Sequence, residues 1–138
     1  MWTAVDFAFN ETLYYEKIVT EQGHTDVVVS GETTKRKYRI VFDGVPMSYR
    51  VTLESYDWCP FDGYENADAL DYRANKVFYT EDSEYLNWFF TVNEKQNAQM
   101  FEEARIYHFQ ILTEDTILDV LSDAVPVIQP VDQTDACC

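Results

Sequence analysis

The chain has 138 residues, of which 46% are hydrophobic and 16% aromatic, and its formal net charge is −15. These values suit one domain with its own core and exclude a disordered acidic tail, because such tails are poor in aromatic residues. The negative charge argues against direct binding to nucleic acid or to an anionic membrane. The N-terminus has no basic segment, and no apolar run approaches the roughly 18 residues of a membrane span. We therefore expect a cytoplasmic protein, in the host cytoplasm or a virion if the source is viral.

The charge is distributed unevenly along the chain. Residues 1–53 hold seven acidic and six basic side chains, whereas residues 54–138 hold eighteen acidic and four basic ones. A charge that only kept the protein in solution would not be expected to concentrate in this way. The asymmetry favours an acidic surface that faces a partner.

The first half of the chain is expected to form β structure. Residues 2–9, 12–20 and 26–29 are rich in aromatic and β-branched residues, although residues 12–20 also allow a helix. The clearest pattern is an alternation of apolar and polar residues over 38–42 and 47–53. These two runs flank Asp43 and Gly44, which predicts an antiparallel hairpin around an Asp-Gly turn.

The middle of the chain is expected to contain a loop and short helices. Residues 56–66 include Pro60 and Gly63 and predict a loop, and residues 67–76 fit a short helix. Residues 85–92 fit a helix or a buried strand equally well. Residues 94–104 favour a helix by propensity.

The last third is expected to hold one more strand and one more helix. Residues 105–112 predict a strand, and Thr113 is placed to cap a helix with Ile117, Leu118 and Leu121 on its core face. Two prolines, at positions 126 and 130, are expected to end regular structure.

Together these elements predict an α+β fold. We expect an antiparallel sheet formed mainly by the N-terminal half, packed with two to four short helices from the C-terminal half. Residues 1–130 would form a single acidic α+β domain, and residues 131–138 a flexible C-terminal tail.

Catalytic, cofactor and metal motifs are not apparent in the sequence. There is no Cys-x-x-Cys, no His-Glu-x-x-His and no glycine-rich phosphate loop, so we expect no cofactor and no enzyme activity. His108 is expected to lie in a strand as a packed or solvated residue. A Cys59–His108 nucleophile pair and an irregular calcium site within residues 57–71 stay as alternatives.

The segment from residue 54 to residue 84 combines nine acidic side chains with many aromatic ones. Tyrosine and tryptophan are enriched at protein interfaces, and carboxylates steer association with a basic partner. Ten residues are candidates for this partner-binding surface: Asp57, Trp58, Asp62, Tyr64, Glu65, Asp68, Asp71, Glu81, Asp82 and Glu84.

The function predicted from these features is that of a non-enzymatic acidic binding protein. It would inhibit or neutralise a basic protein, such as a nuclease, another nucleic-acid-handling enzyme or a toxin. It could do so as an immunity protein or by mimicking the charge of nucleic acid. The alternative is a small structural or assembly protein, for example a virion component, that works through self-association. The sequence leaves the oligomeric state open.

Overall fold

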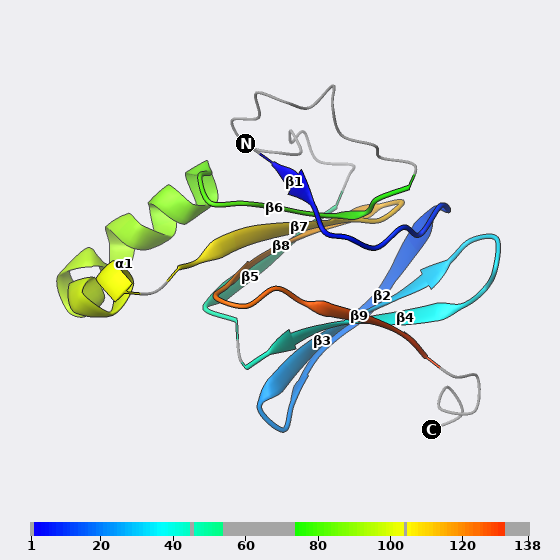
Figure 1. Cartoon of the computed structure of the whole chain (residues 1–138), viewed down its shortest axis with the longest axis horizontal. Helices are drawn as coiled ribbons and strands as arrows, with labels where there is room; N and C mark the ends of the chain where they lie inside the picture. Colours follow the sequence, from blue (N-terminus) through cyan, green and yellow to red (C-terminus); the bar gives the residue numbers. More distant parts are fainter. Residues whose placement is uncertain (1, 45, 54–73, 104, 132–138) are drawn as a thin grey trace.

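Two antiparallel sheets, rather than one sheet covered by several helices, make up the described part of the chain (Figure 1). The computed structural model describes residues 2–44, 46–53, 74–103 and 105–131, excepting the side chains of residues 94–103. Within these residues there is one helix. The predicted α+β fold with two to four helices is therefore wrong, and the protein is mostly β-sheet.

The strands are divided between a five-stranded and a four-stranded sheet. The five-stranded sheet has the order β1 (Thr3–Ala4), β6 (Val77–Thr80), β7 (Tyr107–Leu112), β8 (Thr116–Ser122) and β5 (Ser48–Leu53). The four-stranded sheet has the order β2 (Leu13–Glu21), β3 (His24–Gly31), β4 (Lys37–Asp43) and β9 (Val127–Val131). Helix α1 (Glu84–Glu103) follows β6 in the sequence and extends away from the sheets at one end (Figure 1).

The predicted strands 38–42 and 47–53 exist, but they do not pair with each other. β4 pairs with β3 and β9, whereas β5 pairs with β8 in the other sheet. Asp43 and Gly44, with Gly44 at φ +85°, thus carry the chain from one sheet to the other. The tight hairpin lies between β2 and β3, where Gln22 and Gly23 both have positive φ, as a type I′ turn requires.

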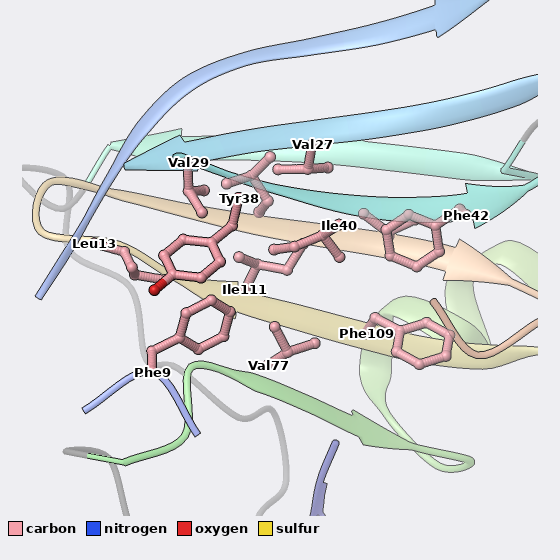
Figure 2. Close-up of a cluster of buried hydrophobic side chains, with 12 residues drawn as sticks. Phe9, Leu13, Val27, Val29, Tyr38, Ile40, Phe42, Val77, Phe109 and Ile111 are labelled. Carbon is pink, nitrogen blue, oxygen red and sulfur yellow. The ribbon is translucent and has the colours of Figure 1, made fainter. Parts of the chain in front are cut away.

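The main core lies between the two sheets (Figure 2). Period-two alternation directs Ile40 and Phe42 of β4 and Phe109 and Ile111 of β7 into this space. The rings of Phe42 and Phe109 meet edge to face across it, with centroids 5.4 Å apart. The buried members of the cluster are Phe9, Leu13, Val27, Val29, Tyr38, Ile40, Phe42, Val77, Phe109, Ile111, Leu118 and Val120.

The helix expected after Thr113 is instead strand β8. All seven of its residues are buried, because β8 lies between β7 and β5 and both of its faces are covered. Leu118 and Val120 face the other sheet, while Ile117, Asp119 and Leu121 alternate with them. A strand buried on both faces has a nearly continuous apolar sequence, which helical spacing can also match.

Residues 85–92 and residues 94–103 of the predicted helix 94–104 belong to the single helix α1, and residue 104 lies outside the described residues. The Ser83 hydroxyl caps this helix by accepting a hydrogen bond from the Leu86 N–H at 3.2 Å. Tyr85, Leu86 and Phe89 then pack against Ile106 and Leu121 in a second apolar cluster. For the predicted helix 67–76, residues 67–73 lie outside the described residues, and residues 74–76 are not helical.

Pro130 was expected to end regular structure, but it lies within strand β9, which ends at Val131. The strand tolerates a proline because it lies at the edge of its sheet and has one strand neighbour, β4. Of the segment 131–138, which we expected to form a tail, residues 132–138 lie outside the described residues.

Glu11 holds the turn between β3 and β4. Its carboxylate accepts hydrogen bonds from the backbone N–H groups of Thr33 and Thr34, at 2.9 and 3.0 Å, and from the Thr34 hydroxyl at 2.8 Å. Burial opposes ionisation of this group, but the hydrogen bonds from Thr34 and Thr33 lower the pKa of the Glu11 carboxyl overall. A Cβ atom on Gly31 would collide with this carboxylate.

We expect Gly31→Ala to lower the free energy of unfolding by roughly 0.5–1 kcal/mol, because the added methyl group displaces the Glu11 carboxylate from its donors. Urea denaturation of the variant measures this cost. In a Glu11→Ala background the same substitution should be neutral or slightly stabilising, since alanine restricts the unfolded chain. An equal cost in both backgrounds would contradict this account of the turn.

Candidate partner-binding face

The structure describes three of the ten candidate residues, and all three lie around the start of α1. Glu81, Asp82 and Glu84 are exposed, and Glu81 is 3.7 Å from Arg105 in an exposed ion pair. Among the described residues, neither Asp82 nor Glu84 has an ion-pair partner. Seven candidates lie outside the described residues: Asp57, Trp58, Asp62, Tyr64, Glu65, Asp68 and Asp71.

A surface hollow of about 520 Å³ lies between strand β5 and the first turns of α1. Two of its aromatic side chains are open to solvent, since Trp88 is 54% exposed and Tyr49 is 48% exposed. Because exposed tryptophan, tyrosine and arginine are the residues most often found at binding hot spots, this composition is typical of a binding surface. The β5–α1 hollow, as we call it, is lined by Ser48, Tyr49, Arg50, Glu84, Tyr85 and Trp88.

Arg50 lines this hollow and is held by two contacts. Its guanidinium carbon lies 4.2 Å from the centre of the Tyr85 ring, and its Nε donates a hydrogen bond to Asp119 Oδ2 at 3.0 Å. The Tyr85 hydroxyl shares a hydrogen bond of 2.6 Å with Ser48. Burial raises the pKa of Tyr85, although the Ser48 hydrogen bond and the Arg50 charge act in the opposite direction.

The carboxylate of Asp119 is the centre of a buried polar network beneath the hollow. Besides Arg50, it accepts hydrogen bonds from His108 Nε2 at 2.6 Å and from the Gln110 side-chain amide at 2.9 Å. Burial opposes ionisation of this group. The hydrogen bonds and charges of His108 and Arg50 outweigh that penalty and hold the pKa of Asp119 below its ordinary value.

The network continues from His108 to the N-terminus of α1. His108 Nδ1 shares a hydrogen bond of 2.8 Å with the Ser83 hydroxyl, which also caps the helix. Ser83, His108 and Asp119 are thus linked in the order of a hydrolytic triad, but they are only 4%, 0% and 3% exposed. A nucleophile must reach its substrate, so this burial favours a role in anchoring α1 to the sheet. His108 lies in a strand, β7, as predicted, and it is packed rather than solvated.

Among the described residues, no group of three or more His, Cys, Asp and Glu side chains is placed to hold a metal ion. The predicted alternatives that involve Cys59 or the acidic residues 57–71 fall outside the described residues. The one helix of the described residues, α1, is not long and apolar enough to cross a membrane.

Comparison with known proteins gives no relative for this chain: no protein-family model, curated protein or solved structure matches it. Its function must therefore be inferred from the geometry of the molecule itself.

Several residues of the site were not predicted from the sequence, namely Tyr49, Arg50, Trp88 and Asp119. Asp119 fitted the solvent-facing side of the predicted helix, so the sequence did not signal that it is buried in β8, where a charged side chain needs partners. Tyr49, Arg50 and Trp88 carry no signal either, because their proximity depends on how β5 and α1 are brought together.

Proposed function

We propose that this chain is a non-enzymatic acidic binding protein that inhibits or neutralises a basic protein partner through the β5–α1 hollow. The partner class is a nucleic-acid-handling enzyme or a toxin, whose basic surface complements a net charge of −15. The observation that carries the proposal is that exposed Trp88 and Glu84 line the same hollow, and that Glu84 has no ion-pair partner in the described part of the chain.

The hollow also has the rigidity that a recognition surface needs. Arg50 is held between Tyr85 and Asp119, and the Ser83–His108 hydrogen bond fixes the start of α1 against the sheet. Preorganised side chains lose little conformational entropy on binding, which preserves affinity. A separate hollow on the four-stranded sheet is lined by three basic residues, Lys17, Lys37 and Arg39, and by three acidic ones, Glu16, Glu21 and Asp26, so its formal charges balance.

Affinity capture from the source cell, washed at low and at high salt, would supply candidate partners. Binding of each purified candidate would then be titrated against the wild-type chain at the two salt concentrations. We expect one-to-one binding whose affinity falls as salt rises, because the carboxylates lie near solvent and are screened. The proposal would be contradicted if the affinity changed neither with the salt concentration nor on neutralising the carboxylates at positions 82 and 84.

Trp88→Ala should weaken binding of that purified partner by about thirtyfold, which corresponds to about 2 kcal/mol, the loss typical of a hot-spot tryptophan. Isothermal titration calorimetry measures this effect. The matched control is Val127→Ala, because Val127 is 57% exposed but belongs to the four-stranded sheet. Equal affinities for the two variants would place the interface elsewhere.

Self-association is the second candidate function, and one observation favours it. Tyr49, Val51 and Leu53 alternate along β5, which lies at the edge of its sheet, and each is more than two-fifths exposed. Exposed apolar side chains on an edge strand are typical of a surface that pairs with another chain. Size-exclusion chromatography with light scattering over a concentration series separates the two candidates, since the binding proposal expects no dependence on concentration.

A further inference from the structure

The molecule already contains one complete site for a guanidinium group. Arg50 stacks over the Tyr85 ring at 4.2 Å while its Nε donates to the Asp119 carboxylate at 3.0 Å. An aromatic face and a carboxylate thus hold the same cation from two directions. This combination suits arginine, whose planar guanidinium stacks on rings and hydrogen-bonds in its own plane.

The β5–α1 hollow contains a second aromatic ring and a second carboxylate, those of Trp88 and Glu84, and both are exposed to solvent. Glu84 and Trp88 are four residues apart in α1, so they lie on the same face of the helix, one turn from each other. Trp88 is 54% exposed, and Glu84 is exposed with no ion-pair partner among the described residues. The Trp88 ring lies 5.8 Å from the Tyr85 ring at an interplanar angle of 34°, so the two rings are neighbours in the hollow.

We propose that the β5–α1 hollow binds an arginine side chain supplied by the basic partner. The guanidinium stacks on Trp88 and donates hydrogen bonds to the Glu84 carboxylate, as Arg50 does with Tyr85 and Asp119. This inference rests on the proposed function and specifies the chemistry of the partner. Arginine is favoured over lysine because an ammonium group is a strongly hydrated point charge that neither stacks nor forms a bidentate pair.

The positive charge of Arg50 does not exclude a second cation from the hollow. The ionised Asp119 carboxylate lies 3.0 Å from Arg50 Nε and balances its charge. Glu84 also lines the hollow and adds a negative charge, which favours entry of a cation. At about 520 Å³, the hollow also falls within the usual range of volumes for ligand pockets, roughly 300–1,000 Å³.

Fluorescently labelled oligo-arginine and oligo-lysine peptides of equal length test this inference by anisotropy titration. We expect the wild-type chain to bind oligo-arginine about tenfold more tightly than oligo-lysine, since stacking on tryptophan adds to the shared electrostatic attraction. Trp88→Ala should remove the preference and leave both peptides bound with similar affinity. Glu84→Gln should weaken the binding of oligo-arginine several-fold.

Glu114→Gln is the matched control, because Glu114 is an exposed carboxylate in the turn between β7 and β8. It removes the same charge and should leave the arginine preference unchanged. Circular dichroism would verify that each variant is folded, and Trp88 and Glu84 are both exposed, so their replacement should preserve the core.

The outcomes separate this inference from the proposed function. Equal binding of the two peptides that still weakens in Glu84→Gln would overturn the arginine inference and leave the basic-partner proposal standing. An arginine preference that survives Trp88→Ala would also overturn the inference. If neither peptide binds, or if an oligo-glutamate peptide binds instead, both the inference and the proposed function fail.

Discussion

Replacing Asp119 with alanine should lower the free energy of unfolding by about 3–5 kcal/mol, the usual cost of removing one partner from a buried ionic network. The substitution leaves the His108 ring N–H and the Gln110 amide without the acceptor that they share in the native state, and it removes the carboxylate that balances Arg50. His108 and Gln110 are 0% and 2% exposed, so water cannot replace the lost acceptor. Urea denaturation followed by circular dichroism measures the change.

The pH dependence of the free energy of unfolding is a second measure of how strongly the Asp119 carboxylate stabilises the fold. A carboxyl group whose pKa is lowered by folding contributes stability that is fully present above its unfolded pKa, near 3.9, and is lost as the pH falls through the folded value. Because the pKa of Asp119 is held below its ordinary value, the wild type should exceed Asp119→Asn in stability at neutral pH. The difference should narrow as the pH falls below about 4.

Asp123→Ala provides the control for this prediction, because Asp123 directly follows β8 and is exposed. A surface substitution of this kind usually changes the free energy of unfolding by less than about 0.5 kcal/mol. If Asp119→Ala were no more destabilising than Asp123→Ala, the carboxylate would not be the organising group of the network. The anchoring of α1 through Ser83 and His108 would then need another explanation.

The period-two alternation in the first half of the chain located strands correctly, but it could not identify their partners. The runs 38–42 and 47–53 became β4 and β5, and the chain bends at Gly44, directly after β4 ends at Asp43. A hairpin turn and a crossover between sheets use the same local residue types. The choice between them is made by strands far away in the sequence, since β4 pairs with β9 and β5 with β8.

The helices of the second half were overpredicted for a related reason. The apolar residues 117, 118 and 121 fit a helical face, yet Leu118 and Leu121 lie on opposite faces of β8. Burial on both faces removes the alternation that distinguishes a strand from a helix. Asp119 could not correct this interpretation, because on a helix with only one buried face an acidic residue is free to point to solvent.

The candidate site was only partly accessible from the sequence. Glu81, Asp82 and Glu84 were predicted from local charge, and they are exposed around the start of α1. The hollow itself was missed, because it depends on the placement of β5 beside α1, and these elements are more than thirty residues apart in the chain. Trp88 lay in a segment that fitted a helix or a strand, so no exposed face could be assigned to it.

Phe109→Ala should lower the free energy of unfolding by about 3–5 kcal/mol, because it opens a cavity at the contact between the two sheets. Phe109 is 0% exposed, and its ring meets that of Phe42 at 5.4 Å (Figure 2). Urea denaturation measures the loss. The exposed Val127→Ala variant is the control, and it should change stability by less than about 0.5 kcal/mol.

The contact itself can be isolated with smaller substitutions that keep the protein folded. Phe42→Leu, Phe109→Leu and the double variant form a double-mutant cycle across the two sheets. We expect the double variant to lose less stability than the sum of the single variants, by about 0.5–1.5 kcal/mol, the usual worth of an aromatic pair beyond its buried area. Strict additivity would mean that the two rings do not interact and that β4 and β7 are not packed face to face. A coupling of the expected size would establish that β4 and β7 pack against each other across the core between the two sheets.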